Sequence, residues 1–376
     1  MGKKSTGALI MRICSKQIVL QTEDAALSEV LPAERALILN IETTGISAER
    51  SRVVLIGCMR RSAGAWDLIQ WFDDTGEEER LILSSFLLYA SEADALVTYG
   101  GDRFDLSFLR KRLAEHDLGT IPEDCLSLDL YKELRPYKKF AGLPDYKQMT
   151  VEAYVGTDRE DTLESAEIAK LYNRFLHFGA REAAEQILSH NEADLCGIAQ
   201  LLPLLRLRQL AEPSLTVRKA QANYYTDHEG VRREEMFLFF RLPAPLPLSV
   251  GGMADHCLFR IDDAEGVLKI PIYTETMRYF YANYKDYYFL PEEDMAIHKY
   301  IASYVDKSHR LQARPETCYT KKTASFLPEW DLFRTPFFKR AYTDDEIFFE
   351  FGTDMKKDRE TLSAYASYVL AHILRS

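Results

Sequence analysis

Two polar residues, Asn40 and Glu42, follow a short apolar run near the start of this chain of 376 residues. On a β-strand, residues two positions apart point to the same face, so these side chains project together. Carboxylate and amide oxygens are ligands that Mg²⁺ and Mn²⁺ prefer. For this motif alone two interpretations stay open: one side of a functional site, or a strand that has ended in solvent.

Two further segments carry residues that can do chemistry. Asp105 follows a Gly100-Gly101 turn where a strand gives way to a helix, a position that is also typical of a helix N-cap. His190 and Asp194 are four residues apart in a helical segment and therefore share one helix face. Such a pair is also typical of an exposed helix surface. A histidine in a site of this kind can take a proton from water near neutral pH.

The elements that must position these residues follow an α/β pattern. Three strands, a helix, a strand, a helix, a strand and further helices predict a mixed five-stranded sheet flanked by helices. The predicted strands are 36–39, 52–59, 66–72, 95–98 and 125–128, and the predicted helices are 77–90, 105–115 and 163–206, the last broken near 178–179.

The chain is long enough for two domains. We expect an N-terminal extension at 1–35, an α/β domain at 36–210, and an α+β accessory domain at 211–376, where prolines and aromatic residues become frequent. In the accessory domain the pattern predicts strands at 236–241, 257–261 and 267–272, and a helix from Pro291 to Asp306. Its many tyrosines are interpreted as core in preference to a stacking platform.

In this order and setting, the motifs resemble those of the DEDD 3′–5′ exonuclease superfamily, and more closely its YprB-like branch of RNase H-like bacterial proteins. That family reads Asp-x-Glu-Thr-Thr-Gly on its first strand, a Gly turn ending in Phe-Asp before a helix, and His-Asn-x-x-Asp on a late helix. The matching stretches are Asn40–Gly45, Gly100–Asp105 and His190–Asp194, and Ser127–Tyr131 is similar to the family's Asp-Leu element. The resemblance covers residues 36–206.

The resemblance implies an RNase H-like fold and a metal-dependent nuclease of the 3′–5′ exonuclease type, acting on single-stranded DNA or RNA. Two ions, Mg²⁺ or Mn²⁺, about 4 Å apart would stabilise charge on the attacking and leaving oxygens. By the same resemblance, Glu42 and Asp194 hold the ion that activates water and Asp105 serves the second ion. His190 stands where the general base is expected, and we expect it at the rim of the site.

Asn40 departs from the family, whose Asp at this position bridges both ions. Its one neutral oxygen can ligate one cation but bridges two poorly, so a weakened nuclease is expected. The alternative is a catalytically inactive nucleic-acid-binding module on an exonuclease scaffold. A nucleotidyl or phosphoryl transferase has no support, because the sequence contains neither G-x-x-x-x-G-K-[ST] nor G-x-G-x-x-G after a strand.

Basic and aromatic residues alternate in 131–140, directly after the fifth predicted strand. This mixture suits a nucleic-acid strand whose phosphates and bases are both contacted, although a solvated helix and loop would have the same composition. The candidate nucleic-acid contacts are Lys132, Arg135, Lys138 and Lys139, together with Thr43 and Thr44 of the first motif.

Composition narrows the remaining possibilities. The net charge of −11 argues against a protein that coats nucleic acid through bulk positive charge, so a nucleic-acid enzyme with this charge must use a local basic patch and metal ions to approach phosphates. The six cysteines include no C-x-x-C pair, which excludes a zinc ribbon and predicts reduced thiols without a disulfide-linked partner. No run reaches the roughly 20 apolar residues of a membrane helix, and we expect a cytoplasmic protein.

Overall fold

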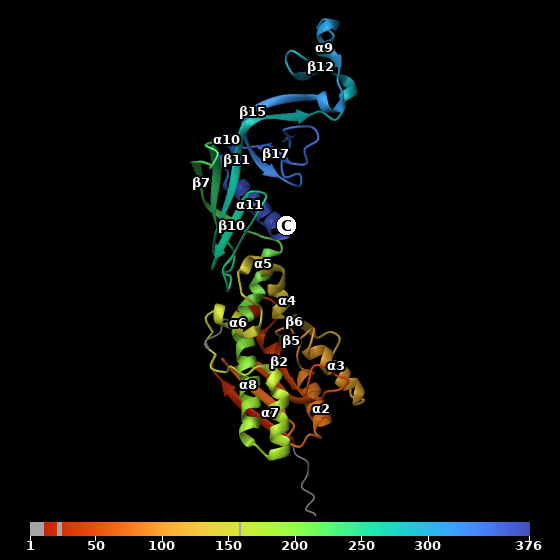
Figure 1. Cartoon of the computed structure of the whole chain (residues 1–376), viewed down its shortest axis with the longest axis vertical. Coiled ribbons are helices and arrows are strands. Elements are labelled where there is room, and N and C mark those ends of the chain that lie inside the picture. Colours follow the sequence, from red (N-terminus) through yellow and green to blue (C-terminus); the bar gives the residue numbers. More distant parts are fainter. Residues whose placement is uncertain (1–10, 21–24, 158) are drawn as a thin grey trace, which may run out of the picture. The chain divides into compact units, whose positions relative to one another are not determined.

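Residues 11–20, 25–157 and 159–376 are described by the computed structural model, and the chain falls into two units. Unit 1 comprises Met1–Arg208 with Leu246–Leu248, and unit 2 comprises Gln209–Pro245 with Ser249–Ser376. Figure 1 labels the elements of both units.

Within the described residues, the sheet of unit 1 has six strands in the order β1-β4-β3-β2-β5-β6. The first four of these are antiparallel neighbours, whereas β5 and β6 run parallel to β2. The predicted mixed sheet is therefore confirmed, with one strand more than expected. The strands are β1 (Arg12–Ile18), β2 (Ala36–Thr43), β3 (Val53–Ser62), β4 (Ala65–Phe72), β5 (Ala95–Thr98) and β6 (Leu126–Asp129).

The additional strand, β1, lies in the segment that the sequence analysis assigned to an N-terminal extension. It pairs with β4 from Arg12 opposite Phe72 to Ile18 opposite Trp66. Its side chains are exposed or half-buried, and even Ile13 is 57% exposed. The strand is held by backbone pairing at the sheet edge, and its side chains lack the buried apolar alternation that predicts a strand.

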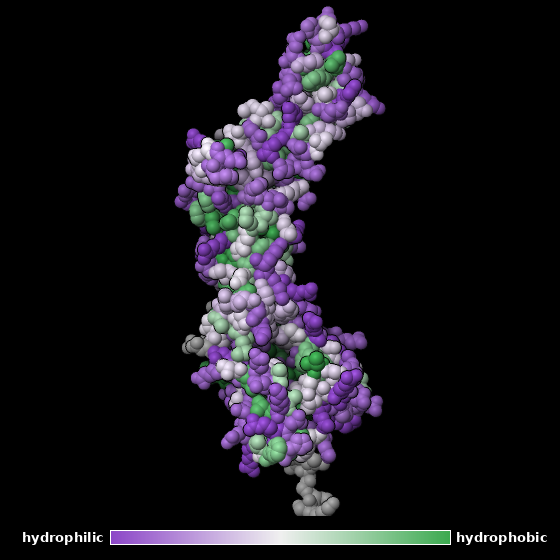
Figure 2. Space-filling model, viewed as in Figure 1, coloured by the Kyte–Doolittle hydropathy of each residue, from purple (hydrophilic) through white to green (hydrophobic). Residues whose placement is uncertain are grey.

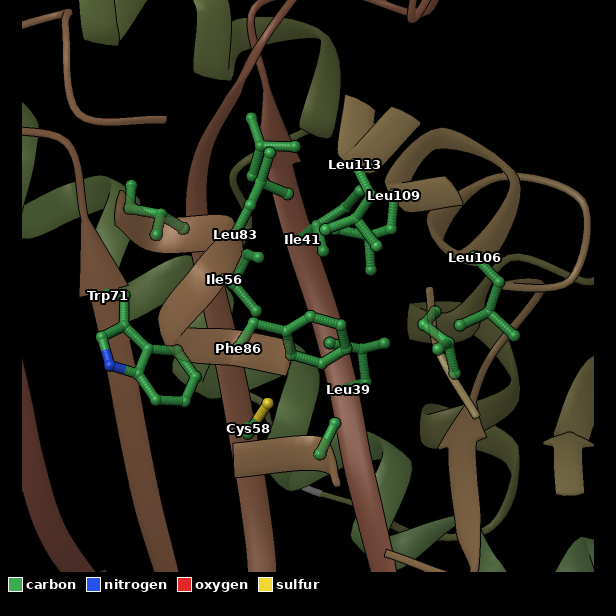
Figure 3. Packing of buried hydrophobic residues seen from close by; sticks show 14 of the residues in the cluster. Leu39, Ile41, Ile56, Cys58, Trp71, Leu83, Phe86, Leu106, Leu109 and Leu113 are labelled. Carbon is green, nitrogen blue, oxygen red and sulfur yellow. The ribbon is translucent and has the colours of Figure 1, made fainter. Parts of the chain in front are cut away.

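Helices cover both faces of the unit 1 sheet. On one face, Leu39 and Ile41 of β2 pack against Phe86 of α2 and Leu109 of α3, as Figure 3 shows. On the other face, α7 and α8 run side by side (Figure 1) over Leu55 of β3. The helices of unit 1 are α1 (Ala25–Ser28), α2 (Glu79–Ala90), α3 (Asp105–Glu115), α4 (Leu130–Leu134), α5 (Lys138–Ala141), α6 (Gln148–Tyr154), α7 (Ser165–Phe178) and α8 (Arg181–Gln200), with 3-10 segments at Ala33–Arg35, Arg135–Tyr137 and Leu202–Leu210.

The break predicted near 178–179 lies between α7 and α8. Gly179 follows α7 with φ of 63°, a left-handed conformation in which glycine ends a helix without strain. The turn brings α8 back along α7, so His190 and Asp194 lie over the sheet. On the face shown in Figure 2 hydrophilic residues are mixed with scattered hydrophobic ones over the helices of unit 1.

Unit 2 is rich in β-structure. Its described residues form an eight-stranded sheet, in which β8 joins β7 to β11, and a three-stranded sheet. Helix α11 packs on β7, β9 and β10. The strands are β7 (Thr216–Thr226), β8 (Arg232–Arg241), β9 (Val250–Ala254), β10 (Cys257–Asp262), β11 (Glu265–Phe280), β12 (Tyr287–Leu290), β13 (Met295–His298), β14 (Leu311–Gln312), β15 (Tyr319–Glu329), β16 (Phe337–Phe338) and β17 (Ile347–Glu350); the helices are α9 (Lys299–Ala302), α10 (Thr353–Lys357) and α11 (Arg359–Arg375), with 3-10 segments at Tyr284–Asp286, Lys307–His309 and Pro315–Thr317.

The helix predicted from Pro291 to Asp306 is wrong. Residues 291–294 form the turn of the β12–β13 hairpin, and only Lys299–Ala302 is helical. Asp294 has φ of 50°, and its carboxylate accepts a hydrogen bond from Lys321. The acidic residues after Pro291 therefore belong to a hairpin turn. From the sequence they were interpreted as the charged N-terminal residues of a helix.

The described residues contain no helix of sufficient length and apolarity to cross a membrane. All six cysteines are free thiols.

Candidate active site

Strand β2 directs Asn40 and Glu42 toward α8. The alternation of the strand sends Leu39 and Ile41 to the opposite face, into the core under α2 and α3. The Asn40 side-chain amide donates to Glu42 Oε1 and to Asp194 Oδ2, both at 3.2 Å. The first motif therefore ends in a site and does not run out into solvent.

Close packing of α8 on β3 sets this geometry. Gly57 pairs with Asn40 across the strands, and a Cβ added at Gly57 would lie 1.9 Å from Asn191 Oδ1. Asn191 donates to the carbonyl oxygen of Asn40 at 3.3 Å and accepts from Gln70 at 2.9 Å. The absence of a side chain at Gly57 lets the helix approach closely enough for Asp194 to reach β2.

His190 and Asp194 of α8 do not form an exposed pair on the helix surface. Ligand atoms of Glu42, His190 and Asp194 lie within 4.8 Å of one another. His190 is only 2% exposed, so it is buried in the floor of the site, whereas a general base was expected at the rim. Its Nε2 lies 3.6 Å from Asp194 Oδ2 and has no hydrogen-bond partner among the described residues.

Asp105, the first residue of α3, is not a side-chain N-cap. Its Oδ1 accepts the backbone N–H of Ile41 at 3.2 Å, which ties the start of α3 to β2 beside Glu42. The preceding turn is held by Asp129 at the end of β6. That carboxylate accepts from the backbone N–H groups of Gly100 (2.6 Å) and Asp102 (3.2 Å), and also caps α4 through Tyr131.

Two residues of the site, Arg159 and Asp161, were not identified from the sequence. Arg159 donates to Asp194 Oδ1 at 2.6 Å and to Asp161 Oδ2 at 2.8 Å, and it also pairs with Glu152. Asp161 Oδ2 lies 2.8 Å from His190 Nδ1. These residues stand in the loop between α6 and α7, 35 and 29 positions from Asp194 and His190, where neither periodicity nor motif spacing indicates them.

Burial opposes the ionisation of two carboxyl groups of the site, those of Glu42 and Asp105. Burial, reinforced by the nearby charge of Asp194, raises the pKa of Glu42 well above its usual range. Burial also raises the pKa of Asp105 to about 7. Burial alone would raise the pKa of Asp161 too, but hydrogen bonds from Arg159 and His190 outweigh it and lower that pKa. When His190 donates its Nδ1 hydrogen to the Asp161 carboxylate, its Nε2 faces Asp194.

These residues suit a hard divalent cation. Buried carboxylates cost free energy unless a positive charge compensates them, and carboxylate oxygens are the ligands that Mg²⁺ or Mn²⁺ prefers. Glu42 and Asp194 would hold such an ion, with His190 Nε2 facing it.

The site opens into a cleft of about 1230 Å³, and all the residues that line the cleft belong to unit 1. Arg103, Lys132, Arg135 and Lys147 lie along it together with aromatic side chains such as Tyr131. The Lys132 ammonium pairs with Asp102, whereas no ion pair within the described residues engages the side chains of Arg103, Arg135 and Lys147.

The other predicted nucleic-acid contacts divide between the cleft and its surroundings. Thr43 lines the cleft, whereas the hydroxyl oxygen of Thr44 accepts the backbone N–H of Arg52 in the β2–β3 turn. Lys138 donates to the Tyr131 hydroxyl and lies over the Tyr146 ring, and Lys139 lies over the Phe140 ring. Neither lysine is among the residues that line the cleft.

The mixed sheet with helices on both faces and an acidic site at the end of β2 defines an RNase H-like α/β domain. Residues 37–206 match the family model RNase_H_2 of the RNase H superfamily. The comparison with curated proteins gave no match.

Solved structures with a distant likeness include Escherichia coli exonuclease I in complex with a dT13 oligonucleotide, at 12% identity and a TM-score of 0.33 over 56% of this chain and 55% of that chain. The family B DNA polymerase of the hyperthermophilic archaeon Pyrobaculum calidifontis is 15% identical, with a TM-score of 0.39 over 48% of this chain and 25% of that chain. The chain thus spans about half of the exonuclease and a quarter of the polymerase. Identities this low do not extend the activities of those proteins to this chain.

Proposed function

We propose that this protein is a metal-dependent nuclease of the 3′–5′ exonuclease type that hydrolyses single-stranded nucleic acid. The observation that carries the proposal is the convergence of Glu42, His190 and Asp194 within 4.8 Å, at the floor of a cleft whose lining also includes basic side chains. The match of residues 37–206 to the RNase H superfamily supports it. The motif set resembles that of the YprB-like branch of the DEDD superfamily, and we assign the chain to that branch as part of the proposal.

The residues then take the following roles. Glu42 and Asp194 hold a divalent cation, Mg²⁺ or Mn²⁺, which when bound stabilises negative charge on the phosphate and acidifies water. His190 accepts the proton of the attacking water at Nε2. Asp161 orients the imidazole through Nδ1 and stabilises the imidazolium that forms, because its carboxylate remains charged.

The substrate lies along the basic side of the cleft. Arg103 and Arg135 present guanidinium groups, which bind phosphates in a bidentate manner. Tyr131 offers a ring on which a base can stack. Because the charge of the whole chain is −11, binding depends on this local surface and weakens steeply with salt.

The test uses single-stranded DNA and RNA oligonucleotides labelled at the 5′ end, with Mn²⁺, with Mg²⁺, or with a chelator. A ladder of shortened 5′-labelled products that requires the metal supports the proposal. Blocking the 3′ end with a phosphorothioate linkage should stop the ladder, and a circular strand should remain intact. Cleavage of the circle would show an endonuclease, and no cleavage under any metal would remove the nuclease assignment.

A second candidate, a nucleic-acid-binding module without turnover, is favoured by two features. Asn40 supplies an amide donor where the family pattern has a carboxylate, and Arg159 already pairs with Asp194. This candidate predicts tight, salt-dependent binding of a single strand that persists in chelator, with no shortening of the strand.

A further inference from the structure

Arg159 occupies an unusual place for a positive charge, directly behind a candidate metal ligand. Its side chain is 8% exposed, and its guanidinium donates to Asp194 Oδ1 at 2.6 Å. It is absent from the described residues that line the cleft. A charge buried in this way is screened little by salt or water, so its effect on Asp194 is larger than that of a surface arginine.

The ligand oxygens that remain accessible suit one ion. A carboxylate bridges two cations most readily through both of its oxygens, and Arg159 engages Oδ1 of Asp194 while Oδ2 faces Asn40 and His190. Asn40 contributes one neutral oxygen. Within the described chain, Glu42, His190 and Asp194 form a single group with ligand distances compatible with a cation.

The unpaired Nε2 atom of His190 indicates that the group of Glu42, His190 and Asp194 takes a ligand. His190 Nε2 is buried without a hydrogen-bond partner among the described residues, and it is directed at the two carboxylates. A buried polar atom of this kind costs free energy unless something pairs with it. The positive charge of Arg159 is shared with Asp161 and Glu152, so Asp194 retains enough negative charge to attract one cation.

We propose that Arg159 limits this site to a single divalent cation, by holding one oxygen of Asp194 and placing a fixed positive charge behind it. In this arrangement the guanidinium compensates negative charge that a second ion would compensate in the two-ion pattern. Arg159 is a positioning residue, because it acts through Asp194. The inference rests on the proposed metal site and replaces the two ions expected from the family resemblance.

The experiment counts bound Mn²⁺ per full-length chain by electron paramagnetic resonance titration. The wild-type chain should bind one Mn²⁺. Arg159→Gln should tighten that ion at least about tenfold, since a nearby positive charge is removed. Combining Arg159→Gln with Asn40→Asp should bring the count to two, and Arg159→Lys should retain one because it keeps the charge.

Arg112→Gln is the matched control, because Arg112 also pairs with a buried carboxylate (Glu79, 2.6 Å), and Glu79 does not belong to the group of Glu42, His190 and Asp194. It should leave both the count and the affinity unchanged. Two Mn²⁺ ions on the wild-type chain would overturn the inference, and so would an Arg159→Gln chain with wild-type affinity. A wild-type count of two overturns the inference even if the variants do not fold.

The two proposals fail separately. One Mn²⁺ per wild-type chain without any cleavage of single strands would leave the role of Arg159 standing and remove the nuclease assignment. Two Mn²⁺ ions with metal-dependent cleavage would do the reverse.

Discussion

The side-chain amide of Asn40 and the Oδ2 atom of Asp194 are joined by a hydrogen bond of 3.2 Å, although 154 positions separate the two residues. The same amide donates to Glu42. Where the family pattern has a fourth acidic group, this protein places a donor between two acceptors. The amide therefore stabilises the site in the absence of a cation, and a cation bound by these carboxylates competes with that hydrogen bonding.

Asn40→Asp should make folding depend on metal. The substitution removes two hydrogen bonds and adds a third carboxylate beside Glu42 and Asp194, so the metal-free chain should lose about 1–3 kcal/mol of stability. Divalent metal should restore the loss, Mg²⁺ gaining more than Mn²⁺ because Mg²⁺ demands stricter oxygen geometry. Thermal melting with and without each ion measures both effects, and strand degradation should rise in parallel.

Asn223→Asp in unit 2 is the control for that experiment. Asn223 also donates to a glutamate, Glu235, at 2.8 Å, but it lies outside the candidate site. This variant should lose stability that Mn²⁺ does not restore. If Asn40→Asp behaves in the same way, the cluster does not bind metal, and the binding-module interpretation takes first place.

His190→Ala should lower turnover by roughly 10²–10⁴-fold, the usual contribution of a general base, while strand binding changes little. His116→Ala serves for comparison, because His116 also pairs with a carboxylate (Glu79, 2.9 Å) and lies outside the cleft. Single-turnover rates at saturating substrate measure the chemical step. An unchanged rate in His190→Ala would assign proton transfer to another group.

The salt dependence of strand binding should identify the basic surface that contacts phosphates. Replacing Arg103 and Arg135 with glutamine should lower the slope of log affinity against log salt by about 1.4, because each phosphate contact to a single strand contributes about 0.7. Replacing Lys138 and Lys139 should change it less, since Lys138 is engaged by Tyr131. A larger change in the lysine pair would place the strand along α5 and not along the cleft.

Gly57→Ala should destabilise unit 1 by about 1–3 kcal/mol, the range for overpacking a well-packed core. The added methyl group would meet Asn191 at 1.9 Å and force α8 away from β2, so metal binding should weaken as well. Gly119→Ala, which meets Leu87 at an ordinary 3.9 Å, should be nearly neutral. Denaturant unfolding of both variants gives the comparison.

The sequence predicts the sheet and its flanking helices where burial is periodic. The bounds of α3, Asp105–Glu115, follow from its amphipathic pattern and agree with the structure. Strand β1 escapes prediction because its outward side chains leave no apolar alternation. The false helix at 291–306 came from a proline and acidic residues, which also suit a hairpin turn.

The residues of the candidate site also divide into those that the sequence predicts and those that it does not. Residues on regular elements, such as Glu42 and His190, could be grouped because strand and helix periodicity places them on defined faces. Arg159 and Asp161 could not, because their loop has no periodicity and their partners are distant in sequence. The burial of His190 also lay beyond prediction, since it depends on how α8 packs over Gly57.

Asp129 joins two parts of the protein that would otherwise respond separately to mutation. One carboxylate accepts hydrogen bonds from the turn before Asp105 and from the start of the segment that carries Lys132 and Arg135. Replacing Asp129 would therefore loosen both the turn that positions Asp105 and the segment that carries Lys132 and Arg135. A screen that scores only loss of activity would rank Asp129 with the catalytic groups, although its carboxylate is already committed to the backbone. Pairing each such variant with a backbone hydrogen-exchange measurement would separate architectural residues from chemical ones.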